Sequence, residues 1–169
     1  MKKGGKGGAR TQTGLHFEKR SDLVAALVDL PGFSVKGFDI FKNSELVARN
    51  CKKHKLYVFL KEQGIDYKKI ISKQLLPDEA IYIPAQKKLY IVELKFQEIG
   101  GSVDEKLQTC DFKKKQYSKL FAPLGIDIEY SYVLNEWFMK PAYRDVLNYV
   151  SAMGCKAFFK TLPIEELGL

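Results

Sequence analysis

The sequence predicts an α/β protein with a central mixed β-sheet flanked by helices. Two β-rich segments, 76–83 and 89–97, are separated by a short loop and predict a β-hairpin near the middle of the chain. After this hairpin, helix-like and strand-like segments alternate to the C-terminus, as expected when helices pack on the faces of a sheet. The 169 residues, of which 46% are hydrophobic, suffice for one domain with a sizeable core.

The N-terminal part is expected to be an arm followed by helices. Residues 1–14 contain five glycines together with lysine and arginine, which predicts a flexible basic arm ahead of a single domain over residues 15–169. A helix is expected from Leu15 to Leu30, because apolar residues recur at helical spacing and Pro31-Gly32 ends the pattern. The next segments are assigned as one strand and two helices: 33–41, 45–64 and 65–75.

The segments after the hairpin are expected to complete the helix and strand layers. Ser102-Val103-Asp104-Glu105 has the pattern of a capping box, which predicts a long helix from Val103 to Ala122. The following segments are assigned as a strand, a helix, a strand and a terminal helical turn: 126–134, 141–153, 155–159 and 163–167.

Basic residues outnumber acidic ones, 28 to 20, which gives a formal net charge of +8 and a pI near 9.3. The excess lies in three stretches, 1–20, 51–75 and 106–119, each with a net charge of +4 or +5. Clustered lysines and arginines are typical of proteins that contact the phosphates of nucleic acid. A set of lysines that simply face solvent is the alternative interpretation of any one cluster.

Cysteine usage and hydropathy favour an intracellular protein. Cys51, Cys110 and Cys155 are odd in number and widely spaced, which predicts reduced, buried thiols rather than disulfides or a zinc site. No apolar run approaches the length of a membrane span, and the basic N-terminus is not followed by the apolar stretch of a secretory signal. We therefore expect a cytoplasmic location with no membrane partner.

The register of the hairpin brings two carboxylates together. If Ile83 pairs with Lys88, Asp78 lies opposite Glu93, with side chains about 5 Å apart on the same face. Alternation places Lys95 and Gln97 on that face too, and it places Val92, Leu94 and Phe96 on the core face. Two carboxylates at this separation repel each other unless a cation lies between them, and their oxygens suit Mg²⁺.

These residues carry a resemblance to a known family. Pro77-Asp78, fourteen residues, and then Glu93-Leu94-Lys95 resemble the signature of the PD-(D/E)XK nucleases. Residues 8–18 are similar to the start of some type II restriction endonucleases, and the helix expected after the motif is similar to the family's core helix. The resemblance implies a restriction-endonuclease-like core and an enzyme that hydrolyses phosphodiester bonds of double-stranded DNA at specific sequences with Mg²⁺.

The resemblance also implies roles for individual residues. Asp78, Glu93 and the backbone carbonyl of Leu94 would hold Mg²⁺, while Lys95 would orient or deprotonate the attacking water and stabilise the phosphate. Glu18 would bind a second metal ion or position the first. Further contacts to DNA are expected from four residues: Arg10, Gln97, Lys106 and Lys113.

Each proposed ligand also has an ordinary structural interpretation. An aspartate after proline, such as Asp78, commonly starts a turn, and Glu93 with Lys95 suits an exposed salt bridge. Glu18 suits the first turn of a helix.

Two other functions remain open from the sequence. A structure-specific recombination or repair nuclease, such as a Holliday junction resolvase, has a similar arrangement of carboxylates on a short basic chain. A basic DNA-binding protein without catalysis explains the charge equally well, but it leaves Asp78, Glu93 and Lys95 unexplained. A palindromic DNA target would imply a homodimer, because the symmetry of the protein would match that of the site.

Overall fold

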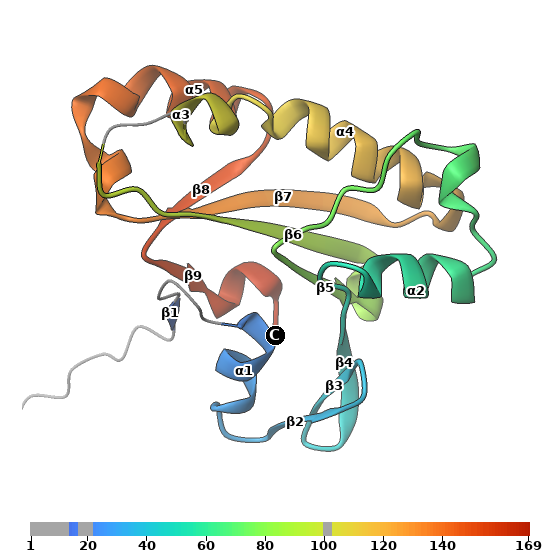
Figure 1. The fold of residues 1–169 in the computed structure, drawn as a ribbon. Coiled ribbons are helices and arrows are strands. Elements are labelled where there is room, and N and C mark those ends of the chain that lie inside the picture. Colours follow the sequence, from blue (N-terminus) through green and yellow to red (C-terminus); the bar gives the residue numbers. More distant parts are fainter. Residues whose placement is uncertain (1–13, 17–21, 100–102) are drawn as a thin grey trace, which may run out of the picture.

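A mixed β-sheet of seven strands forms the centre of the computed structural model, which describes residues 14–16, 22–99 and 103–169 (Figure 1). The order of the strands in the sheet is their order in the chain: β2 (Phe33–Lys36), β3 (Asp39–Lys42), β4 (Glu45–Asn50), β5 (Glu79–Ile83), β6 (Lys88–Lys95), β7 (Asp127–Leu134) and β8 (Lys156–Phe159). Neighbours are antiparallel from β2 to β6 and parallel from β6 to β8. The expected mixed sheet is therefore confirmed.

Helices cover both faces of this sheet. The α-helices in the described ranges are α1 (Leu23–Val28), α2 (Lys55–Glu62), α3 (Val103–Leu107), α4 (Cys110–Phe121) and α5 (Arg144–Ala152). Single 3-10 turns are η1 (Tyr67–Lys69), η2 (Pro84–Gln86), η3 (Ala122–Leu124), η4 (Glu136–Met139), η5 (Pro141–Tyr143) and η6 (Ile164–Leu167). None of these helices has the length and apolar character needed to cross a membrane.

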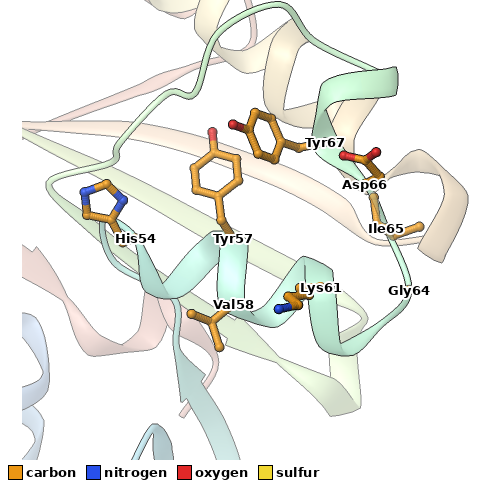
Figure 2. Close-up of a pocket in the computed structure, with 8 residues that line it drawn as sticks. All are labelled: His54, Tyr57, Val58, Lys61, Gly64, Ile65, Asp66 and Tyr67. Carbon is orange, nitrogen blue, oxygen red and sulfur yellow. The ribbon is translucent and has the colours of Figure 1, made fainter.

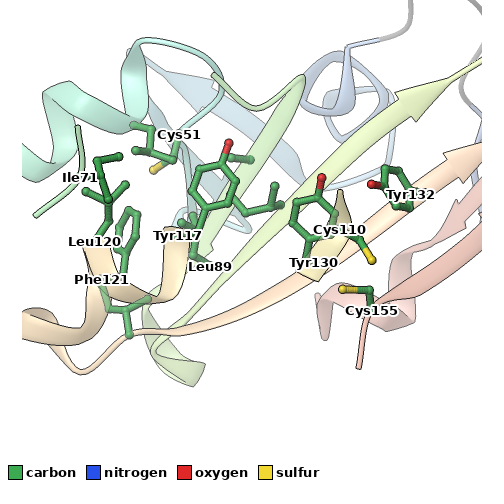
Figure 3. Close-up of a cluster of buried hydrophobic side chains, with 14 of the residues drawn as sticks. Cys51, Ile71, Leu89, Cys110, Tyr117, Leu120, Phe121, Tyr130, Tyr132 and Cys155 are labelled. Atoms are coloured by element: carbon green, nitrogen blue, oxygen red, sulfur yellow. The ribbon is translucent and has the colours of Figure 1, made fainter. Parts of the chain in front are cut away.

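The core is divided into two layers by the sheet. On one face, buried residues of α2, α4 and α5 pack against Leu89, Ile91 and Tyr130; Figure 3 shows part of this cluster. On the other face, α1 and η6 pack against Ile81 and Val92. A separate two-stranded sheet joins β1 (Gly14–His16) to β9 (Thr161–Pro163). The expected helices flanking the sheet are thus present on both sides (Figure 1).

The three thiols lie within this core. Cys51, Cys110 and Cys155 are free and buried, as expected. Burial raises the pKa of Cys51 and of Cys155 to about 12, so both thiols are protonated and unreactive at neutral pH.

Several element predictions in the N-terminal half are wrong. Instead of a helix from residue 15 to 30, the described residues show β1 and the short α1, whose first turn is capped by the Asp22 carboxylate accepting from Val24 N–H at 2.9 Å. The segment 33–41 contains most of two strands, separated by the left-handed Gly37. Residues 45–50 form β4 rather than the start of a helix, because the left-handed pair Asn43-Ser44 makes a tight turn that pairs β4 with β3.

Two other expected helices are shortened or interrupted, and the later segments differ only at their ends. The expected helix over 65–75 is reduced to η1, followed by an irregular segment. The expected helix over 103–122 is interrupted at Gln108-Thr109, which separates α3 from α4. The helix over 141–153 starts with η5 before α5. The strands β7 and β8 and the terminal turn η6 lie where the sequence predicts them, within one residue.

The irregular segment before β5 is fixed by a tyrosine from α2. The hydroxyl of Tyr57 donates to the carbonyl of Leu75 at 2.9 Å and accepts from its N–H at 2.7 Å. A third contact, from Lys53 N–H to the carbonyl of Pro77 at 3.1 Å, anchors the chain immediately before Asp78. The position of Asp78 therefore depends on α2 as well as on the sheet.

We predict that Tyr57→Phe lowers the free energy of unfolding by about 1–3 kcal/mol, because it leaves two polar backbone groups of Leu75 without their partner. Denaturant unfolding measures this change. The matched control is Tyr67→Phe, in the ring that meets Tyr57 edge-on at 4.9 Å. An equal effect of both substitutions would contradict the assignment.

Candidate active site

The hairpin of β5 and β6 has the register that the sequence predicts. Ile83 pairs with Lys88, and the ladder continues to Glu79 and Val92. Asp78 precedes the first residue of β5, and the same register directs it toward Glu93. The two carboxylates share one lysine, Lys95, at the amino end of β5 and the carboxyl end of β6.

The prediction that the core lies on one face of β6, that of Val92, Leu94 and Phe96, is incomplete, because the other face is buried too. Leu89 and Ile91 lie on the same face of β6 as Glu93 and belong to the core under α2 and α4. Core residues pack against both faces of β6, and Glu93 is only 4% exposed. The carboxylate is thus a buried charge at the end of an apolar strand, and such a charge needs a partner.

Lys95 supplies that partner and gathers three oxygen atoms. Its Nζ lies 2.9 Å from Glu93 Oε2, 3.2 Å from Asp78 Oδ2 and 3.1 Å from the carbonyl oxygen of Leu94. Burial works to lower the pKa of Lys95, but the attraction of Glu93 and Asp78 outweighs it and the pKa is raised. Three oxygens therefore converge on one positive charge.

A second lysine reaches the same carboxylate from α4. Lys113 Nζ lies 3.2 Å from Glu93 Oε2, the oxygen that Lys95 also contacts. The sequence predicted Lys113 as a DNA contact and missed its contact with Glu93, because nothing in the spacing of residues fixes how α4 packs on β6.

The site opens to solvent on the side of Asp78. The side chain of Asp78 is 41% exposed, whereas that of Glu93 is 5% exposed. The backbone N–H of Leu94 donates to Asp78 Oδ2 at 3.1 Å and so orients the more accessible carboxylate. A ligand approaching this cluster would meet Asp78 first and Glu93 at the bottom.

Asn135, another residue that sequence reasoning missed, fixes the end of β6. Its side chain accepts from Gln97 N–H at 3.2 Å and donates to the Gln97 carbonyl at 2.7 Å. The side chain of Gln97 is buried, and its amide donates to the carbonyl of Ile99 at 2.9 Å. The segment after Lys95 is therefore tied to the end of β7.

The other residues predicted to act are distributed more widely. Lys106 is exposed on α3, whose end is held by Tyr132 through its hydroxyl. Glu18 and Arg10 lie outside the described residues, as does most of the predicted arm over 1–14. Their roles, and that of Gln97 toward DNA, stay predictions.

The oxygen donors suit a hard cation. Within the described ranges, no group of three or more histidine, cysteine, aspartate and glutamate side chains has a metal-binding arrangement. The set available here is two carboxylates and a backbone carbonyl, focused on the ammonium of Lys95. Carboxylate and carbonyl oxygens are the ligands that Mg²⁺ accepts, and Mg²⁺ keeps waters in its remaining positions. The donor set therefore fits Mg²⁺.

A second acidic cluster lies across the sheet. Glu79, next to Asp78 in the chain, faces α1 and is 5% exposed. Lys52 Nζ lies 3.6 Å from Glu79 Oε1 and also pairs with the carboxylate of Asp22. Burial raises the pKa of Glu79 to about 7, with Lys52 opposing the shift, whereas the two carboxylates raise the pKa of Lys52.

A large hollow lies elsewhere in the described part of the chain. A cavity of about 550 Å³ is bounded by α2 and the segment after it, and Figure 2 shows its lining: His54, Tyr57, Val58, Lys61, Gly64, Ile65, Asp66 and Tyr67. None of the residues around Lys95 belongs to this lining. The cavity is therefore separate from the carboxylate cluster.

Comparison with protein-family models, with curated proteins and with solved structures gave no match. The geometry of the cluster itself is therefore the basis for inferring a function.

The raised pKa of Glu79 predicts a pH-dependent stability. Glu79 titrates near pH 7 in the folded protein and near its ordinary value of 4.5 when unfolded. Between pH 4.5 and 7 the folded state therefore binds more protons at Glu79 than the unfolded state does. The free energy of unfolding falls across this pH range as the pH rises.

We predict that Glu79→Gln flattens this part of the pH profile and raises the free energy of unfolding above pH 7 by on the order of 1–3 kcal/mol. Asp22 still pairs with Lys52 in the variant. Denaturant unfolding at about pH 5, 6, 7 and 8 measures how the free energy of unfolding depends on pH. Asp127→Asn, at the exposed start of β7, is the control. A wild-type slope retained in Glu79→Gln would contradict the assignment.

Proposed function

We propose that the protein is a Mg²⁺-dependent endonuclease of the PD-(D/E)XK type that hydrolyses phosphodiester bonds of double-stranded DNA at specific sequences. The observation that carries the proposal is the convergence of Asp78 Oδ2, Glu93 Oε2 and the carbonyl oxygen of Leu94 on Lys95 Nζ, at 2.9–3.2 Å. An exposed surface salt bridge would need neither the buried Glu93 nor the backbone oxygen.

Asp78, Glu93 and the carbonyl of Leu94 would hold Mg²⁺. When bound, the ion would lower the pKa of a coordinated water and neutralise charge on the phosphate. The different exposure of the two carboxylates supports such a site: Glu93 is buried at the bottom, while Asp78 is accessible at the rim. Glu18, which the resemblance assigns to a second metal ion or to positioning the first, keeps that proposed role.

Lys95 would act on the water and the phosphate. Its side chain is 16% exposed, so its ammonium is largely shielded from solvent and its interactions with charged groups are strengthened. A positive charge placed in advance beside the scissile phosphate would stabilise the charge that develops there. With its pKa raised, Lys95 is a donor that orients the water and the phosphate, and this supports the orienting role over that of a general base.

The charge of the chain supports DNA as the substrate. The net charge of +8 and the exposed Lys106 favour contacts to phosphates, and Arg10, Gln97 and Lys113 keep their predicted roles there. The antiparallel strands β2–β4 and the segment after β7 lie outside the hairpin and α4. These would provide surface for base contacts, and a palindromic target would be cut by a homodimer.

We predict that the protein cleaves plasmid DNA into discrete fragments in the presence of Mg²⁺. The rate of cleavage should fall by about 100-fold or more in Asp78→Asn and in Lys95→Ala. Glu79→Gln is the matched control: it makes the same chemical change one residue from Asp78, on the opposite face of the sheet. Gel analysis measures the rates, and sequencing of the fragment ends gives the site.

Other outcomes would favour the alternative functions. Cleavage of a four-way junction but not of linear duplex would indicate a recombination nuclease. Binding to DNA without cleavage in Mg²⁺ or Mn²⁺, unchanged in Asp78→Asn, would indicate a non-catalytic DNA-binding protein.

A further inference from the structure

One oxygen of Glu93 is shared by two ammonium groups. Lys95 Nζ lies 2.9 Å and Lys113 Nζ lies 3.2 Å from Glu93 Oε2. Two positive charges at one oxygen repel each other, and the arrangement is stable only because Asp78 supplies a second negative charge, 3.2 Å from Lys95. The cluster of two carboxylates and two lysines is therefore electrically neutral as it stands.

The two lysines are held very differently. Lys95 is bound by Glu93, by Asp78 and by the carbonyl of Leu94, all within its own hairpin. Lys113 comes from α4, its ammonium is paired with Glu93, and its side chain is 26% exposed. One turn further along α4, Tyr117 is buried in the core and fixes this side of the helix against the sheet. Lys113 can therefore leave Glu93 without any movement of α4 or β6.

We propose that Lys113 is a phosphate-binding residue that is held on Glu93 in the free protein and is released to the scissile phosphate when a divalent cation binds Glu93. This inference rests on the proposed nuclease function and adds a residue from α4 to the site.

The charges of the cluster give the reason. A divalent cation competes with both lysines for Glu93 Oε2, because all three bind it through positive charge. Lys95 keeps further partners in its own hairpin, whereas Lys113 is the more exposed of the two and is the one released. When the cation binds, the neutral cluster acquires two positive charges and then attracts the phosphodiester anion. A phosphate oxygen bound by the same cation would lie beside Glu93 Oε2, and Lys113 Nζ, 3.2 Å from that oxygen in the free protein, would be within reach of it.

Opposite effects on the two ligands distinguish this arrangement from a purely structural ion pair. Removing the charge of Lys113 removes a competitor of the cation, so Ca²⁺ should bind the DNA-free protein more tightly. The same change removes a phosphate contact, so duplex DNA in Ca²⁺ should bind more weakly. An ion pair that served only to hold α4 would give no loss of DNA affinity beyond that of any lysine on the helix.

The test uses the full chain with Lys113→Met and with Lys113→Gln, which keeps a hydrogen-bond donor for Glu93 if the apolar variant does not fold. Titration calorimetry with CaCl₂ alone measures cation affinity, and fluorescence anisotropy with labelled duplex DNA in Ca²⁺ measures DNA affinity. We expect the Ca²⁺ dissociation constant to fall about threefold or more and that of DNA to rise about tenfold. Lys119→Met, at an exposed position of α4, is the control, with no change in Ca²⁺ affinity and at most about a threefold loss for DNA.

The possible results separate this inference from the proposed function. If the wild type cleaves DNA and binds Ca²⁺, but Lys113→Gln leaves Ca²⁺ affinity unchanged or weakens it, the role of Lys113 is overturned while the nuclease stands. The role of Lys113 is also overturned if Lys113→Gln and Lys119→Met weaken DNA binding equally. If the wild type binds no Ca²⁺ and cuts no DNA in Mg²⁺, the proposed function fails and the inference fails with it.

Discussion

A buried carboxylate constrains the arrangement of this site. Glu93 is 4% exposed at the end of a strand whose preceding residues on the same face are apolar. An ionised carboxylate in that position is costly unless positive groups reach it, and two do, at 2.9 and 3.2 Å. Lys95 lies only two residues from Glu93 on β6, but Lys113 reaches Glu93 only because α4 packs over the end of this strand. The packing of the helix layer and the chemistry of the cluster are therefore linked through one oxygen atom.

The two acidic residues at the start of β5 lie in different environments, because successive side chains of a strand point to opposite faces of the sheet. Asp78 lies on the face of α4, 41% exposed beside Lys95, whereas Glu79 faces α1 and is buried, with its pKa raised to about 7. A shift of one residue in the β5–β6 register would exchange these environments and place the wrong carboxylate beside Lys95. The register is held by apolar residues on both faces of the hairpin, so core packing protects the position of Asp78.

The sequence predicted best what depends on local spacing. The register of the hairpin follows from a short loop and from alternation, and it brought Asp78, Glu93 and Lys95 together correctly. What failed depends on distant parts of the chain. Residues 45–50 have acceptable helix formers but pair with β3, and the contacts of Lys113 with Glu93 and of Asn135 with Gln97 join segments 20 and 38 residues apart. No local pattern encodes such contacts.

The position of the cluster follows from the topology of the sheet. β6 is the strand at which the pairing changes, antiparallel toward β5 and parallel toward β7. At its carboxyl end, the chain that leads into β5 lies on one side and the segment that follows β7 lies on the other, where Asn135 ties it to Gln97. Side chains from both halves of the sheet can meet there without crossing a strand, and the helices that connect parallel strands cover the faces but leave this edge open. The junction therefore brings together a shielded carboxylate and an accessible one, within reach of the same ammonium, and the proposed hydrolysis depends on this arrangement.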